Sequence, residues 1–306
     1  MLCVDTKKKE SLGGLLSARH LLKEDYGQVH VKFATPILEG EIWQENYAAG
    51  AGLPARESAD FRRSVNWLSR AVMTRINSHA VVTPVNLMAT ILLGPPKHAL
   101  LESQLELYLV SFSRRCELPG VDSLRGGSRR EGGQAIEHAE PLRLIERNPH
   151  AMGDFLFLSQ RGALGATYLR NNVLHCFIIS GVVASILINR HRVSEKRVQD
   201  LCRELYPYLK NELFLPWSEA ELELVVRQVL EHMYQLELLK KQRGMLVIPE
   251  GHSHSHHLLS IIASTSKGTL ERFYIALQLI ITHPPGYYTE QSLEEDCVLM
   301  AQRLSL

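Results

Sequence analysis

The apolar run Val173–Ile188 is the feature that most limits how this chain can fold. A helix that crosses a membrane needs about 20 consecutive apolar residues, whereas this run is shorter and carries His175. Cationic residues bound it on both sides, with Arg170 before it and the tripeptide Arg190–Arg192 after it. We therefore predict a helix buried in a protein core. A helix lying in the plane of a membrane surface is the alternative.

The first forty residues carry the pattern of one helix followed by one strand. Apolar residues recur at helical spacing over Ser11–Lys23, and they alternate with polar residues over Val29–Phe33 before Pro36 ends the pattern. One helix and one strand cannot bury both faces of a sheet. Residues 1–40 are thus predicted to be the last helix-strand unit of an α/β domain whose other strands lie outside the chain, and residues 41–60 to be a linker.

Residues 61–306 are predicted to form a domain that is mainly α with small β-hairpins. Apolar residues at helical spacing predict helices in residues 62–78, 86–93, 101–112, 269–282 and 292–304. Residues 120–133 are too polar and too rich in glycine to pack, which predicts a loop. The class is therefore α+β with a helical C-terminal domain.

Two stretches of this domain share a plan of one helix followed by two strands. The first, residues 134–158, has its first strand predicted at Leu142–Arg147. In the second, residues 218–249, Ser218 and Glu221 have the spacing of a capping box and Met245–Ile248 form the last strand. A helix followed by a hairpin is the ending of a winged-helix unit. We therefore expect two winged-helix-like units that flank the apolar helix.

Charge and cysteine content exclude several classes. A formal net charge of +1 over 306 residues gives no basic footprint for nucleic acid, and 45% hydrophobic residues suffice for a packed core. The cysteine count of five is odd and includes no C-x-x-C, so neither a disulfide framework nor a zinc ribbon is expected. The N-terminal residues M-L-C-V-D-T-K-K-K have no apolar signal region, so the sequence does not predict secretion.

Several tracts occur in an order that is typical of one enzyme family. Residues 167–217 contain T-Y-x-R-N-N-x-L-H and then L-Y-P-x-L-K-x-E-L-F-L-x-W. Near the start stand K-K-K-E-S-L-G-G-L-L and Y-G-Q-V-H-V-K-F-A-T-P-I. This order resembles the C-terminal half of the membrane-bound glycerol-3-phosphate acyltransferases of bacteria. The dihydroxyacetone-phosphate acyltransferases are more distant relatives.

The resemblance implies a fragment of a glycerol-3-phosphate 1-O-acyltransferase. Such an enzyme passes an acyl group from acyl-CoA or acyl-carrier protein to glycerol 3-phosphate, in the first step of phospholipid synthesis. An H-x4-D motif supplies its base, and an E-G-T-R-S-type segment binds the acceptor phosphate. These motifs are expected before Met1, so this chain alone is predicted to be inactive. The resemblance implies no cofactor, no metal and no nucleic acid, and a peripheral location at the lipid surface of the cytoplasmic face of the inner membrane.

Two segments superficially match the family's catalytic motifs. His20 and Asp25 have the H-x4-D spacing, but they fall after the place where the family's catalytic motifs finish. The segment V-I-P-E-G-H-S, residues 247–253, lacks the arginine of the phosphate-binding segment and lies on the second hairpin. We interpret the first as a solvated helix face and the second as part of a turn.

Arg170, Asn171 and Asn172 are the best candidates for binding within the chain. A guanidinium contacts phosphate through two hydrogen bonds, and neighbouring amides could orient it. The alternative is that these groups cap or brace the start of the apolar helix. As a hypothesis, Arg170 faces the missing catalytic domain.

Two further groups of side chains have weaker functional interpretations. The cationic residues His191, Arg192, Lys196 and Arg197 could meet anionic lipid headgroups, or form an ordinary solvated helix start. The histidines at 252, 254, 256 and 257 could bind a metal, but a polar loop is favoured. If the family resemblance is set aside, the alternative function is a non-catalytic winged-helix-like module that binds other proteins.

Overall fold

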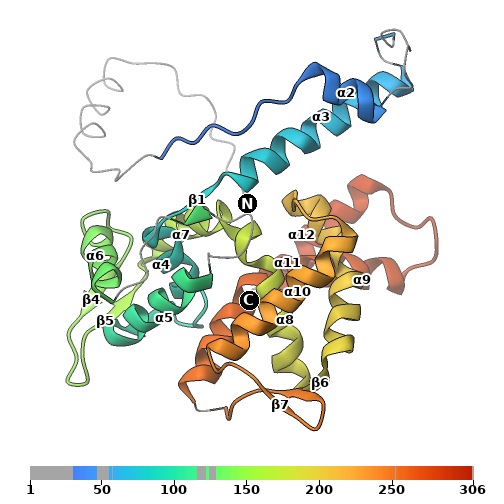
Figure 1. The fold of residues 1–306 in the computed structure, drawn as a ribbon. Helices are drawn as coiled ribbons and strands as arrows, with labels where there is room; N and C mark the ends of the chain where they lie inside the picture. The colour runs from blue at the N-terminus through green and yellow to red at the C-terminus, as the bar shows by residue number, and fades with distance from the viewer. Residues whose placement is uncertain are drawn as a thin grey trace.

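The computed structural model describes residues 30–46, 55–56, 58–115, 122–123, 129–251 and 253–304. The described elements in chain order are α2 (Glu39–Asn46), α3 (Ala59–Ser78), β1 (Val81–Val82), α4 (Pro84–Leu92), β2 (Ala99–Leu101), α5 (Glu102–Arg115), β3 (Asp122–Ser123), α6 (Arg129–Ala139), β4 (Glu146–Asn148), β5 (Phe155–Phe157), α7 (Gln160–Asn171), α8 (Leu174–Arg190), β6 (Arg192–Ser194), α9 (Glu195–Leu213), α10 (Glu219–Gln235), β7 (Lys240–Gln242), β8 (Met245–Val247), α11 (His254–Thr282) and α12 (Glu290–Leu304). Helices dominate and the strands are short, which confirms a mainly α protein with small β-hairpins (Figure 1).

The chain contains two modules with the same order of elements. The first module runs α4-β2-α5-α6-β4-β5, and the second runs α8-β6-α9-α10-β7-β8. Each builds a three-stranded antiparallel sheet, β2-β5-β4 or β6-β8-β7, in which the last strand lies in the middle. The modules begin at residues 84 and 174 and end at residues 157 and 247, so the second follows the first by 90 residues at both ends.

A further helix follows each module and packs against its first helix. Helix α7 packs on α4, and α11 packs on α8. Both helices begin with a serine cap, because the side chains of Ser159 and Ser253 accept from the amides of Gly162 and His256. The repeat therefore includes the helix after each hairpin.

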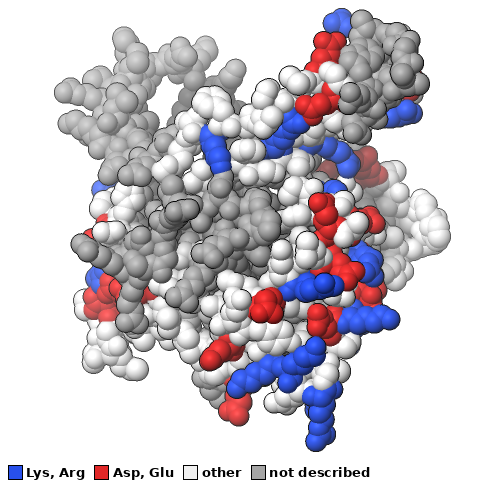
Figure 2. Space-filling model, in the orientation of Figure 1, with Lys and Arg blue, Asp and Glu red and all other residues white. Residues whose placement is uncertain are grey.

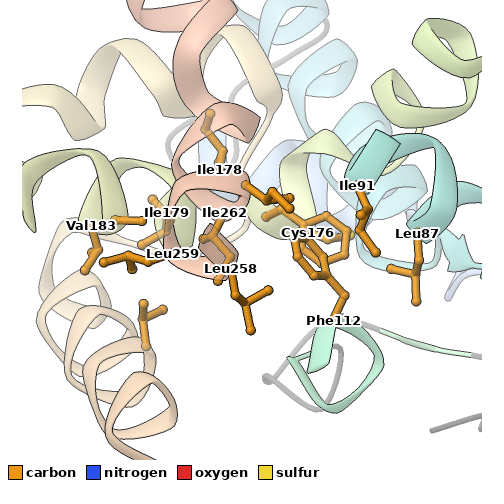
Figure 3. Packing of buried hydrophobic residues seen from close by; sticks show 14 of the residues in the cluster. Leu87, Ile91, Phe112, Cys176, Ile178, Ile179, Val183, Leu258, Leu259 and Ile262 are labelled. Atoms are coloured by element: carbon orange, nitrogen blue, oxygen red, sulfur yellow. The ribbon is translucent and has the colours of Figure 1, made fainter. Parts of the chain in front are cut away.

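Helix α8 is the most deeply buried element of the second module. Every residue from Leu174 to Ala184 is buried, and so is Leu187. Its side chains meet those of α11, such as Leu258 and Ile262, and one continuous core reaches Ile91 and Phe112 of the first module (Figure 3). The prediction of a buried core helix is thus confirmed. The helix begins the second module, however, and does not stand between the two units as expected.

Helices α8 and α11 approach each other closely at a glycine. A Cβ atom built on Gly181 of α8 would lie 2.3 Å from Thr265 Oγ1 and 2.9 Å from the backbone nitrogen of Ser266, both on α11. Buried hydroxyl groups line the same contact, since the oxygens of Ser185 and Ser266 lie 3.0 Å apart. Only a glycine at position 181 lets the two backbones approach this closely.

Most of the predicted helices agree with the structure. Helices α3, α4, α5 and α12 cover the predicted ranges to within a few residues, and α11 ends before Pro284 as expected. The capping box is present, with Ser218 Oγ accepting from the amide of Glu221 and the Glu221 carboxylate accepting from the amide of Ser218. The same helix buries one apolar face, at Leu222, Val225, Val226, Val229 and Met233.

The strand predicted over Val29–Phe33 is wrong for its described part. Residues 30–38 form no helix or strand, and the side chains of Val31 and Phe33 are 74% and 90% exposed. No strand among the described residues pairs with this segment, and an unpaired strand is not stable. The helix predicted over residues 11–23 lies outside the described residues.

Four other boundaries differ from the predictions. Helix α11 begins at His254, 15 residues before the predicted start, so His254, His256 and His257 lie in a helix and not in the predicted loop. Helix α2 occupies part of the predicted linker, and α6 begins at Arg129 inside the predicted loop. The strand predicted at Leu142–Arg147 begins only at Glu146, because Arg143 has a positive φ of 53° in the turn that precedes it.

We predict that Gly181→Ala lowers the free energy of unfolding by about 1–3 kcal/mol, because the added methyl overpacks the contact between α8 and α11. The matched control is Gly268→Ala in α11, where the nearest atom to a built Cβ is Arg272 Nη1 at 4.0 Å. That change should be neutral or should stabilise by about 0.5–1 kcal/mol. Urea unfolding of both variants measures the difference, and equal stabilities would contradict this account of the contact.

Candidate functional site

The predicted binding residues lie at a sharp corner of the backbone. Helices α7 and α8 meet at an angle of 90°, and Asn171 and Asn172 stand at the bend. Asn172 is the C-cap of α7 and Val173 is the N-cap of α8. No single helix of the described ranges is long and apolar enough to span a membrane. Within these ranges only α7 and α8 taken together have the length and apolar composition of a span, and they are bent at this corner. The corner places two adjacent amide side chains at the surface, where both are exposed.

A buried asparagine of the first module holds the corner. The amide of Val173 donates to the carbonyl of Arg170, which leaves the carbonyl of Leu169 without its usual helical donor. Asn86 Nδ2 donates to that carbonyl at 2.9 Å. Asn86 is itself fixed, because its Oδ1 accepts from the amide and the hydroxyl of Thr83 in the capping box of α4. A polar side chain of α4 thus fixes the end of α7.

Arg170 lies in the last turn of α7 and contacts the next residue, Asn171. Its Nε and Nη2 donate to Asn171 Oδ1 at 3.3 and 3.0 Å. Burial, and secondarily the positive charge of Arg272, lower the pKa of Arg170. Among the described residues no carboxylate pairs with this guanidinium, and the effect of Arg272 on its pKa means that two guanidinium groups repel each other near the corner.

A cavity of about 650 Å³ opens beside the two amides. Four segments line it: residues 30–34, the end of α3 with the residues after it, the α7–α8 corner, and the end of α9. Asn171 and Asn172 belong to its lining, but Arg170 does not. The structure therefore brings two of the three predicted residues into the cavity and places the third where it orients Asn171.

The lining of the cavity suits an anion. Lys32, His30 and His79 contribute cationic or ionisable groups, and Glu212 is the one carboxylate among the lining residues. Arg272 pairs with Glu212, so the negative charge of that carboxylate is balanced. Because Asn171 Oδ1 accepts from Arg170, the amide of Asn171 has its Nδ2–H groups left to donate.

Two further residues join the cavity wall to the core. The Nε2–H of His175 donates to the carbonyl of Asn77 at 2.9 Å, and Asn77 Nδ2 donates to the carbonyl of Leu213 at 2.8 Å. Burial lowers the pKa of His175, so the imidazole is held neutral at the start of α8. These bonds connect α3, α8 and α9 at one side of the cavity.

None of the other sequence candidates that the structure describes lines this cavity. His20, Asp25 and His252 lie outside the described residues. His254 stacks on Tyr108, with ring centroids 4.8 Å apart. No group of three or more His, Cys, Asp or Glu side chains within the described ranges could hold a metal ion.

Sequence reasoning missed the residues that build the site around Asn171 and Asn172. Nothing in the spacing of Asn77 and Asn86 connected them with a corner almost a hundred residues later. Arg272 lies in the middle of a long helix with no local signal. Their roles follow only from contacts between distant segments.

Comparisons with known proteins agree on one family. A family model described as "Glycerol-3-phosphate acyltransferase C-terminal region" matches residues 5–306. Proteins named glycerol-3-phosphate acyltransferase from Pseudomonas aeruginosa (strain LESB58) and Pseudomonas fluorescens (strain SBW25) are each 34% identical over 98% of this chain. One from Pseudomonas putida (strain W619) is 35% identical over 98% of it. The chain spans only 36–37% of the length of these relatives.

We predict that Asn86→Ala lowers the free energy of unfolding by about 1–3 kcal/mol, because it leaves the carbonyl of Leu169 buried without a donor. Asn189→Ala is the control, since it removes an amide bonded to a carbonyl on the exposed face of α8. It should change stability by less than about 0.5 kcal/mol. Thermal unfolding followed by circular dichroism compares the two, and an equal loss in both variants would argue against a special role for Asn86.

Proposed function

Because this chain belongs to the glycerol-3-phosphate acyltransferase family, of which it matches the C-terminal region, we propose that it serves acyl transfer to glycerol 3-phosphate as the non-catalytic part of such an enzyme. The acyl group would come from acyl-CoA or acyl-carrier protein and pass to the 1-hydroxyl group, in the first step of phospholipid synthesis. The observation that carries the proposal is the family match over residues 5–306.

The catalytic residues of the reaction are proposed to lie outside residues 1–306. The matched relatives are nearly three times as long as the stretch that this chain covers. Among the described residues, no hydrogen bond joins a histidine of the cavity lining to a carboxylate: His79 and His175 bond backbone carbonyls, and Glu212 pairs with Arg272. His20 and Asp25 have the right spacing but follow the place where the family motif is expected.

The cavity at the α7–α8 corner is the part of the chain that we propose contacts phosphate. Amide donors of Asn171 and Asn172, with Lys32 nearby, match the acceptor oxygens of a phosphate group. Arg170 would hold Asn171 in place and add positive charge behind it. Such a site could bind the phosphate of glycerol 3-phosphate at the face that meets the catalytic part of the enzyme.

Domain division and location complete the proposal. Residues 1–40 would end the acyltransferase domain, residues 41–60 would link it, and residues 61–306 would form the helical C-terminal domain. The enzyme would lie peripherally on the cytoplasmic face of the inner membrane. It would contact membrane lipid and would not bind nucleic acid.

The proposal is tested by an acyltransferase assay with acyl-CoA and glycerol 3-phosphate. The 306-residue chain is assayed alone and joined behind the N-terminal part of the P. aeruginosa relative. We expect 1-acylglycerol 3-phosphate from the joined protein only. Activity of the short chain that disappears in His20→Ala would instead make His20 the base and overturn the proposal.

Phosphate binding at the corner is tested separately by calorimetric titration with glycerol 3-phosphate and with inorganic phosphate. Asn171→Asp keeps the shape of the side chain but replaces donors with a negative charge, and it should weaken binding at least about tenfold. Asn189→Asp makes the same change on α8, where it faces solvent away from the cavity lining, and should leave binding unchanged. Equal affinities of the two variants for phosphate would contradict the proposal that phosphate binds in this cavity.

A second candidate function rests on the repeated modules. In each module a strand, two helices and a hairpin follow the first helix, and the sheet order places the last strand in the middle. This is the order of elements in a winged-helix unit, a fold that binds other macromolecules. A joined protein that is inactive, while the chain alone captures a protein partner, would favour an interaction module.

A further inference from the structure

The two modules differ in the charge of their hairpins. In the first hairpin the one cation of β4, Arg147, is enclosed by the carboxylates of Glu102, Glu140 and Asp154 at 2.6, 2.8 and 2.9 Å. In the second hairpin β7 reads Lys-Lys-Gln over Lys240–Gln242, and all three side chains are exposed. Lys241 is the counterpart of Arg147 in the register, and it too contacts a carboxylate, Glu195, although only one. The modules differ most at the preceding position, where Glu146 of β4 corresponds to Lys240 of β7.

Five cationic side chains gather on the sheet of the second module. We call them the cationic hairpin surface: Arg190, Arg192, Lys240, Lys241 and Arg243. The register pairs Arg192 and Lys240 with the same residue of β8, Val247, so both project from one face of the sheet, about 10 Å apart. Lys241 pairs with Leu246 and projects from the other face, while Arg190 at the end of α8 and Arg243 in the turn flank the strands. Figure 2 shows blue side chains over the end of the molecule where Figure 1 places β6 and β7.

These cations are largely unpaired. Lys241 lies 3.6 Å from the carboxylate of Glu195, and the other four make no ion pair with any residue that the structure describes. The nearest carboxylates along the hairpin, Glu237 and Glu250, lie outside its two strands. All five side chains of the surface are exposed. An exposed cationic cluster of this size attracts an anionic partner.

The chemistry of the surroundings selects the partner. A protein interface needs an apolar or aromatic anchor at its centre, and the outward side chains of β7 and its turn are Lys, Gln and Arg. A nucleic acid duplex would meet the helix before the hairpin, α10, which carries four glutamates and one arginine. A plane of anionic headgroups needs neither an apolar anchor nor a cationic helix.

We propose that the cationic hairpin surface binds the headgroups of anionic phospholipids. Helix α8, about 25 Å long, separates this surface from the cavity at its other end. Contact with a lipid surface there would leave the α7–α8 corner free for the catalytic part of the enzyme. The inference rests on the proposed peripheral membrane location and assigns the residues that make the contact.

The test is sedimentation of the 306-residue chain with lipid vesicles. We expect binding to vesicles that contain phosphatidylglycerol, little binding to vesicles of phosphatidylcholine alone, and release as salt is raised. Lys240→Gln/Lys241→Gln/Arg243→Gln should lower the partition coefficient at least about tenfold. The matched control, Lys97→Gln/Arg227→Gln/Lys267→Gln, removes the same charge from other exposed positions and should retain binding.

The outcomes separate this inference from the proposed function. Wild-type protein that binds neither kind of vesicle would overturn the lipid contact. The proposed function would not be affected by that result, because the acyltransferase assay on the joined protein in detergent tests it separately. Equal losses of vesicle binding in both triple variants would mean that binding depends only on the net charge of the protein. That result would overturn the assignment of the contact to the hairpin. Binding of duplex DNA or of an acidic protein through the hairpin, without vesicle binding, would also overturn it.

Discussion

The contact between α8 and α11 is the interaction on which the rest of the structure depends. Gly181 lets the two backbones approach so closely that hydroxyl groups from both helices share the interface with apolar side chains. Helix α8 begins at the cavity corner and leads at its other end into β6, the first strand of the cationic sheet. A displacement of α8 would therefore alter both proposed binding surfaces at once.

The repeated modules explain how one architecture carries two different surfaces. Each first helix is covered by the helix that follows its hairpin, so the core is built twice by the same packing. The modules differ in exposed side chains, such as Glu146 of the first hairpin and Lys240 of the second, which occupy the same register position. The fold is thus shared, while the surface chemistry is specific to each module.

The sequence predicted those features that depend on neighbouring residues. The burial of α8 follows from its unbroken apolar composition, and the start of α10 follows from the spacing of Ser218 and Glu221. The strand expected at Val29–Phe33 failed because a strand also needs a partner, which a local pattern does not reveal. Strands β2 and β6 were missed because three residues are too few to show alternation. Asn171 and Asn172 were identified as candidates, but their cavity is formed by four segments far apart in the chain.

The corner that holds these two amides has a consequence for the order of folding. Its hydrogen bonds join residues 83, 98 and 136 positions apart, through Asn86, His175 and Asn77. Such contacts close long loops, and loop closure of this kind is slow compared with the formation of a single helix. The cavity is therefore complete only when segments from distant parts of the chain have come together. A ligand that binds there would recognise the completed domain and not a partly folded chain.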